Sequence, residues 1–151
     1  MARFFRRGVS KLKFLPAWAG TNPTAPELTA GTSLDAALAD ISGFEFANTP
    51  IPTPDLGTTF TSTIPGEDTT QNPTITFYDD DAGSAIRTAI PKGTAGFLAF
   101  MPYGQVATKR VEKWPIKVTG INDAWTAANE AAKFVAGFAV TAAPTQTAVL
   151  P

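Results

Sequence analysis

Residues 55–104 read DLGTTFTSTIPGEDTTQNPTITFYDDDAGSAIRTAIPKGTAGFLAFMPYG, and this stretch decides the predicted fold. From 56 to 64, one face of an extended chain carries Leu56, Phe60 and Ile64, a period of two that predicts a half-buried strand. β-Branched and aromatic residues then fill 74–78, between Pro73 and an acidic run, and predict a second strand. We expect these two strands to pair antiparallel.

A short helix follows over about 81–90, where the apolar period changes from strand to helix. Asp80 or Asp81 can cap its first turn, and Pro91 ends it. The apolar face that we expect to pack on a sheet carries Ala82, Ala85, Ile86, Ala89 and Ile90. A buried strand over 97–101 comes next.

The rest of the chain also favours strands. Alternating or β-branched runs predict strands at 12–18, 41–46, 106–121 and 133–141, the last apolar on both faces and therefore central. One or two helical turns are expected over 33–40, and Pro115 predicts an edge or a bulge. The fold class predicted is mainly β, a β-sandwich or barrel with one short flanking helix, in a single domain of 151 residues.

Composition limits the chemistry. The chain has no Cys and no His, which removes disulfides, thiolate metal sites and the commonest general base. The acidic run at 79–81 could hold Ca²⁺ or Mg²⁺; capping of the helix is the simpler interpretation. No phosphate loop or activated serine is found. We therefore expect no enzymatic activity, no cofactor and no metal.

No apolar run reaches the length needed to span a bilayer, and the N-terminus lacks the features of a secretory signal. Only 17% of residues are charged, with 13 Pro and 12 Gly. A surface with so few charges suggests that much of the exterior meets protein instead of water.

Charge is unevenly distributed. Five of the 12 basic residues and none of the 13 acidic ones lie in residues 1–13, so the remainder has a net charge of −6. A nucleic-acid-binding tail is one interpretation. Docking on the acidic body of a neighbouring copy, with Phe4, Phe5 and Val9 buried, is the other, and the paired Phe residues favour it.

Two further features leave alternatives open. Pro50, Pro52 and Pro54 stiffen a segment that is either a projecting arm gripping a partner or a crossover between strands. Trp18, Trp114 and Trp125 could instead serve a monomeric β-sandwich that binds carbohydrate or protein.

The order of the parts resembles the major tail tube protein of long-tailed, non-contractile bacteriophages. The resemblance is carried by MARFFRRGVSKLKFLP, PDLGTTFTSTIPG, TITFYDDDAGSAIRTAIPKGTAGFLAFMPYG and FVAGFAVTAAP, and its most specific part is TFYDD followed by IRTAI and MPYG. It implies a structural virion protein that forms six-membered rings, stacked as the hollow tube through which the genome leaves. A tail terminator or a related injection-machine protein is the alternative within this class.

The resemblance also implies partners and boundaries. The partners are other copies of the chain, a tape measure protein in the lumen, the tail terminator and the distal tail or baseplate proteins. DNA passes without specific binding, and assembly takes place in the host cytoplasm. Residues 1–13 and 144–151 become arms around a core of 14–143. The residues expected at subunit interfaces are Arg3, Phe4, Phe5, Arg6, Arg7, Pro50, Pro52, Pro54, Val149 and Leu150.

Overall fold

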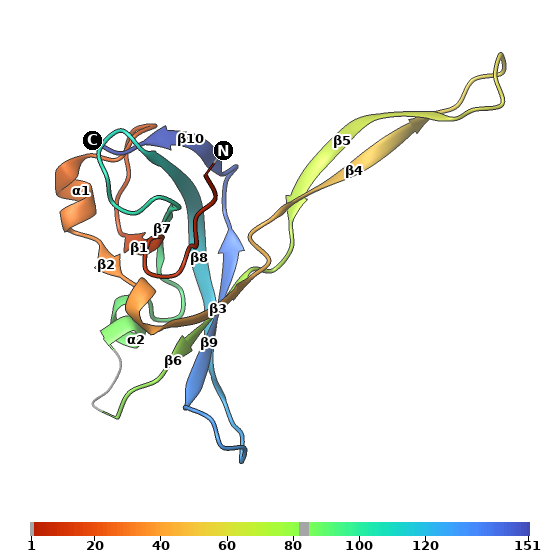
Figure 1. The fold of residues 1–151 in the computed structure, drawn as a ribbon. Coiled ribbons are helices and arrows are strands. Elements are labelled where there is room, and N and C mark those ends of the chain that lie inside the picture. The colour runs from red at the N-terminus through yellow and green to blue at the C-terminus, as the bar shows by residue number, and fades with distance from the viewer. Residues whose placement is uncertain (1, 82–84) are drawn as a thin grey trace.

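The computed structural model describes residues 2–81 and 85–151. Its elements, labelled in Figure 1, are β1 (Lys11–Leu15), α1 (Ala25–Thr29), β2 (Thr32–Ser33), the 3-10 turn η1 (Asp35–Ala37), β3 (Leu38–Ser42), β4 (Phe46–Thr53), β5 (Ser62–Thr70), β6 (Thr74–Tyr78), α2 (Ala85–Ala89), β7 (Ala95–Met101), β8 (Arg110–Ala124), β9 (Lys133–Val140) and β10 (Thr145–Val149). Eight strands form one antiparallel sheet in the order β2-β1-β7-β8-β9-β6-β3, with β10 also paired to β8. Strands β4 and β5 form a separate two-stranded sheet. The predicted mainly β, sandwich-like class is confirmed.

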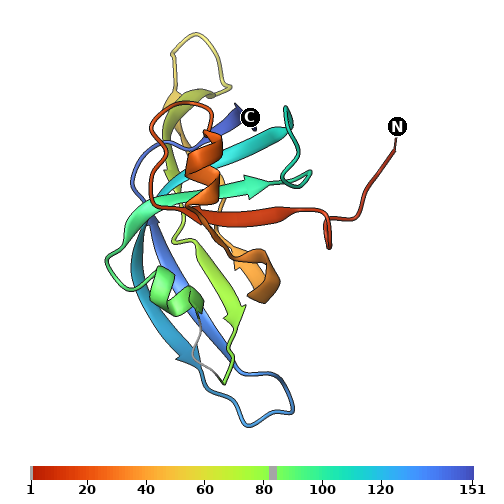
Figure 2. The same cartoon turned by 90° about the vertical axis from the view of Figure 1, so that its left-hand side faces the viewer.

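The large sheet bends around its main core. Figure 2 shows β1 and β7 running across the view while β6 and β9 descend steeply, so the two ends of the sheet face each other over an enclosed interior. Helix α2 closes this interior from one side. The buried side chains that fill it are Leu12, Phe14, Leu34, Ile75, Phe77, Ile86, Ile90, Leu98, Trp114, Ile116, Val118, Phe134, Ala136 and Phe138.

A second core lies on the opposite face of β1, β7 and the first half of β8. Its buried members are Leu15, Trp18, Leu28, Ala99, Met101, Val111, Ala148 and Leu150. Helix α1 covers this face through Leu28. Because β7 is buried on both sides, apolar residues occupy successive positions along it.

Helix α1 was not predicted from the sequence. Thr24 and Glu27 form a capping box, in which the Thr24 side chain accepts from the Glu27 amide and the Glu27 carboxylate accepts from the Thr24 amide. The hydrogen bond from the Thr24 hydroxyl is the largest cause that lowers the pKa of Glu27. The sequence pattern Thr24-Ala-Pro26-Glu27 carried the signal, since Pro is favoured in the first turn of a helix.

The long strand β8 joins the two halves of the sheet. On one side it pairs with β7; on the other its first half pairs with β10 and its second half with β9. Pro115 lies where that second neighbour changes, between the pairs Thr145↔Lys113 and Ile116↔Val140. The predicted edge or bulge at Pro115 was therefore wrong. The strand is internal, and the missing N–H falls in the gap between two neighbours.

Helix α2 is held by its apolar face and by one arginine. Ile86 and Ile90 are 7% and 0% exposed, Ala89 packs on the main core, and Ala85 is exposed. Arg87 pairs with Asp79 and Asp123 and lies over the Phe134 ring at 4.4 Å. Asp80 and Asp81 are exposed before the helix. The cap predicted for them involves the amides of residues 82–84, which lie outside the described residues, as does Ala82.

The first strand predicted from the sequence was wrong. Residues 55–61 form a loop, and the strand β5 begins only at Ser62 and continues through Gly66 to Thr70. The expected pairing was also wrong, because β6 pairs with β3 and β9 while β5 pairs with β4. The alternation of apolar residues over 56–64 did not indicate a strand packed on a core, because it runs from a loop into a strand that faces no core.

Other boundaries shift by a few residues. The helical turns expected over 33–40 shrink to η1, and the strand expected over 41–46 divides into β3 and β4 around Gly43, whose φ is +85°. A Cβ at Gly43 would lie 2.8 Å from the Cα of Pro73, so the two chain segments cross closely at this point. Among the described residues, no helix is long and apolar enough to cross a membrane.

Replacing Ile86 with Asp is expected to unfold or strongly destabilise the protein. A carboxylate would be buried without a partner, at a cost of about 3 kcal/mol or more, which lowers the melting temperature by roughly 10 °C. Ala85→Asp is the matched control, because its side chain is exposed in the preceding position of the same helix. Equal melting temperatures for the two variants, measured by circular dichroism, would contradict the packing described above.

Candidate assembly surfaces

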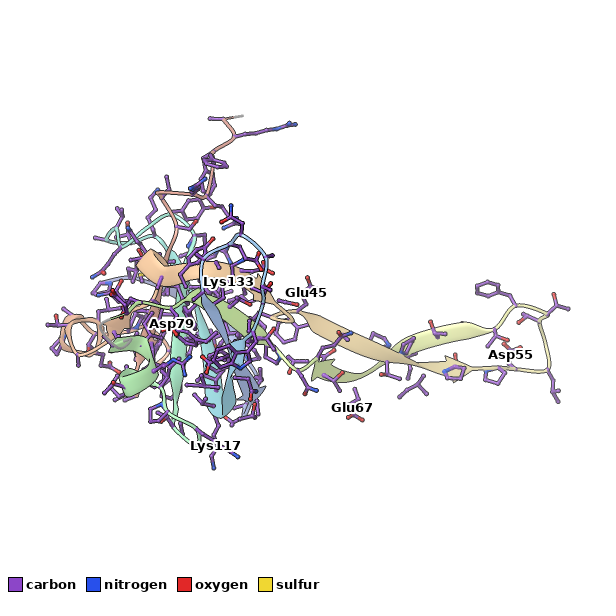
Figure 3. All side chains as sticks on the ribbon, turned by 90° about the horizontal axis from the view of Figure 1, so that it is seen from below. Glu45, Asp55, Glu67, Asp79, Lys117 and Lys133 are labelled. Atoms are coloured by element: carbon purple, nitrogen blue, oxygen red, sulfur yellow. The ribbon has the colours of Figure 1, made fainter. Side chains whose placement is uncertain are left out.

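The β4–β5 hairpin projects from the body. In Figure 3 it extends far to one side, with Glu45 at its base, Glu67 along its length and Asp55 in its tip. β4 and β5 pair with each other from Phe46↔Thr70 to Thr53↔Ser62 and with no other strand. At the base, the Phe46 ring stacks on Trp114 at 5.7 Å, and this contact joins the hairpin to the main core. The prolines at 50, 52 and 54 therefore lie on this projecting hairpin and not on a crossover between strands.

The hairpin exposes large apolar side chains. Ile51 and Ile64 are directly paired across the two strands and are 50% and 51% exposed. Leu56 and Phe60, in the tip, are 108% and 77% exposed. A two-stranded hairpin is marginal in water on its own, so this apolar surface is suited to burial against another molecule.

Polar contacts nevertheless give the hairpin a defined shape. Asp55 accepts from the amides of Gly57 and Thr58 in the tip. Asn48 donates to the Gly66 carbonyl and accepts from the Gly66 amide, beside a register shift after Thr49. A Cβ at Gly66 would overlap the Thr49 carbonyl oxygen, so this irregularity in the pairing requires glycine.

The N-terminal segment, residues 2–10, forms a second projecting element, which we call the arm. It leaves β1 at Lys11 and points away from the body in Figure 2. Phe4 packs on Tyr103 at 5.4 Å, the Arg6 guanidinium lies over the Phe4 ring, and Ser10 donates to the Pro102 carbonyl. Phe5 is 73% exposed, and Arg3, Arg6 and Arg7 are all exposed.

A groove runs along the inner end of the arm. Its volume is about 820 Å³, and it lies between Arg7 on the arm and Ile41, Tyr78 and Met101 on the sheet. Lys11 and Asp35 form an ion pair at 3.3 Å on its wall. Burial works to raise the pKa of Asp35, but hydrogen bonds from Ser33 and Lys11 outweigh it and hold the pKa below its usual value.

Ionic contacts in the described residues gather in the body. They join Lys11 to Asp35, Arg110 to Glu112, and Arg87 to two aspartates. In residues 2–81 and 85–151, no ion pair involves an arm arginine or a hairpin carboxylate. Nor do three acidic side chains meet, within these residues, in a group that could hold a metal ion.

Comparison of the sequence with family models decides the family. The model described as phage tail tube protein matches residues 1–151. The chain belongs to the phage tail tube protein family. It is a structural protein of the tail tube, and its place is the virion. A search of curated proteins finds no match.

Solved structures share the fold of this tail tube protein at low sequence identity. The tail of an empty gene transfer agent (GTA) particle, refined with helical and C6 symmetry, matches with a TM-score of 0.57 and 14% identity over 97% of this chain and 99% of that chain. The sixfold-symmetrised baseplate of the anti-feeding prophage matches with a TM-score of 0.65 and 8% identity over 97% and 98%. The virion of a native GTA particle matches with 0.52 and 16% over 79% and 90%.

The residues expected at interfaces fall into two groups. Arg3, Phe4, Phe5, Arg6, Arg7, Pro50, Pro52 and Pro54 are exposed on the arm and the hairpin. Val149 is 41% exposed, but Leu150 is 3% exposed in the second core. Residues 145–149 are strand β10 of the chain's own sheet, which corrects the predicted C-terminal arm of 144–151. The predicted N-terminal arm of 1–13 likewise ends earlier, since β1 begins at Lys11.

The alternative use of the tryptophans is not supported. Trp18 and Trp114 are 3% and 2% exposed and belong to the two cores, so neither can stack on a sugar. Trp125 alone of the three is exposed, at 90%. The sequence pattern did not indicate that Leu56 and Phe60 are exposed in a projecting tip, because their alternation is also typical of a strand face packed on the body.

Replacing Gly66 with Ala is expected to loosen the hairpin without destabilising the body of the tail tube protein. The added methyl group overlaps backbone and costs about 1–3 kcal/mol locally, while the hairpin contributes little to either core. In the unassembled protein, hydrogen exchange of hairpin amides should accelerate about tenfold or more, with an unchanged melting temperature. Gly57→Ala, in the tip, is the control, since a Cβ there meets only the Asp55 side chain at 3.2 Å.

Proposed function

We propose that this chain assembles into hexameric rings that stack as the hollow tail tube, the conduit through which the genome passes into the host cell. Membership of the phage tail tube protein family supports this proposal. Sixfold symmetry is supported by the related folds, since the GTA tail has C6 symmetry and the anti-feeding prophage baseplate is sixfold symmetrised. Assembly takes place in the host cytoplasm.

The hairpin is the single observation that carries the proposal. It is a two-stranded sheet that extends beyond the body and exposes Leu56 and Phe60 at its tip. An isolated hairpin of this kind gains little stability in water, and contiguous exposed apolar residues favour association. Another copy of the chain, displaced along the tube axis, would cover these residues.

Edge strands support closure into a ring. β3 pairs on one side only, with β6, and the two-residue β2 ends the opposite side of the sheet. Unpaired strand edges invite association, and a closed ring of subunits removes them. Stacked rings then repeat one contact along the axis and leave the tube hollow.

Further partners follow from the function of a tube. A tape measure protein occupies the lumen during assembly, a tail terminator closes one end, and distal tail or baseplate proteins bind the other. Without residues 1–13 the chain carries a net charge of −6, which repels the phosphate backbone and lets DNA pass without specific binding.

The proposal is tested by electron microscopy and light scattering of the purified protein. We expect tubes or rings from the full chain. Phe46 and Thr70 are paired, so residues 47–69 can be replaced by an Asn-Gly turn that closes the shortened hairpin. This variant should keep the melting temperature of the body and form no stacked tubes, because it lacks the axial contact.

A milder variant tests the apolar tip contact without shortening the hairpin. Leu56→Ser with Phe60→Ser removes only apolar tip side chains, and we expect it to raise the protein concentration needed for tube formation about tenfold or more. Normal tubes from the shortened variant would contradict the role of the hairpin. A full chain that stays monomeric at high concentration would contradict self-assembly itself.

A further inference from the structure

Two exposed segments of the chain carry opposite charge. The arm contains Arg3, Arg6 and Arg7 and no acidic residue, whereas residues 43–73, which form the hairpin and its base, contain Glu45, Asp55, Glu67 and Asp68 and no basic residue. We propose that the arm of one copy binds along the β4–β5 hairpin of a neighbouring copy. This inference rests on the proposed self-assembly and names the contact that directs it.

The two segments do not pair within one chain. Figures 2 and 3 show the arm and the hairpin leaving the body in different directions. The contacts of the arm are to Tyr103 and Pro102, and the hairpin reaches the body through Phe46 and Trp114. Among the described residues, the ion pairs leave out the arm arginines and the hairpin carboxylates alike. Their charges are therefore available to a second copy.

The apolar surfaces also match. Phe5 is 73% exposed on the arm, and the cross-strand pair Ile51 and Ile64 is about half exposed on the hairpin shaft. Bound together, they remove apolar surface from water in both partners. The acidic residues lie on both sides of this pair along the hairpin, with Glu45 and Glu67 toward the base and Asp55 in the tip (Figure 3). Phe5 itself is flanked by Arg3, Arg6 and Arg7.

Backbone groups favour one side of the hairpin. Both strands pair on one edge only, so each has an outer edge with free donors and acceptors. Pro50 and Pro52 remove donors from β4, while β5 contains one proline, Pro65. The arm has no regular secondary structure before its turn at Arg7. It can add beside β5, next to Glu67 and Asp68, as an extra strand.

The opposite charges of the arm and the hairpin act mainly on the rate and register of association. Exposed charges attract over about 8–10 Å at physiological ionic strength and steer the encounter, while like charges in contact cost several kcal/mol. Head-to-tail pairing of an arm with a hairpin repeats without closing, which suits a contact along a tube. Each copy offers one arm and one hairpin, so every pairing leaves one of each free for the next copy.

The test is a charge swap with rescue, monitored by electron microscopy and by the rise in light scattering. The arm variant is Arg3→Glu with Arg7→Glu, and the hairpin variant is Glu45→Lys with Glu67→Lys; all four side chains are exposed. Each variant alone should raise the concentration needed for tube formation about tenfold or more. The chain carrying all four changes should form tubes again at close to the original concentration. Lys92→Glu with Lys117→Glu, exposed elsewhere, matches the charge change of the arm variant and should leave assembly unchanged.

If the unmodified chain forms tubes, either of two results would overturn the inference. One is normal assembly by either double variant. The other is failure of both double variants without rescue in the fourfold variant, which would show that the two segments contact other surfaces. If the unmodified chain forms no tubes, the proposed function fails, and this inference fails with it. Melting temperatures of the unassembled variants confirm that the body remains folded.

Discussion

Burial of apolar side chains on both faces of β7 and β8 is the constraint on which the rest of the structure depends. One face of these strands closes the main core with α2, and the other is covered by α1 and by the end of the chain around Leu150. β8 is long enough to have β10 as a neighbour in its first half and β9 in its second. A single strand thus joins two cores, and the sequence holds no cysteine that could add a disulfide to them.

The projecting elements are outside this arrangement. The hairpin and the arm add little to either core; their contacts with the body include the ring pairs of Phe46 with Trp114 and Phe4 with Tyr103 and the hydrogen bond from Ser10 to the Pro102 carbonyl. The residues of the two cores are therefore different from those exposed on the hairpin and the arm. The ionic contacts of the body are local, as around Arg87, whereas within residues 2–81 and 85–151 no ion pair involves an arm arginine or a hairpin carboxylate.

Sequence reasoning found what depends on local patterns. The buried strands β6, β7 and β9 follow from periodicity and from flanking Pro and Gly residues, as do the burial of Ile86 and Ile90 and the packing of Ala89; Ala85, predicted on the same face, is exposed. The family was visible in the order of the motifs. It failed where no core dictates the pattern. The hairpin is solvated on both faces, so the alternation of Leu56, Phe60 and Ile64 did not mark a strand facing the body. The partner of β10 was also beyond reach, since a pairing of Ala148 with Val111 depends on segments far apart in the sequence.

The close crossing of Gly43 and Pro73 separates two kinds of evolutionary pressure. Beyond this crossing, a substitution between Phe46 and Thr70 is expected to change the folding free energy of the body little, and the proposed contact between copies would then be what selects among such substitutions. Inside the crossing, substitutions are filtered by stability first. The hairpin of this chain can therefore change in length and charge while its body keeps the same architecture. A subunit can in this way become incompatible with foreign tubes without any loss of its own fold.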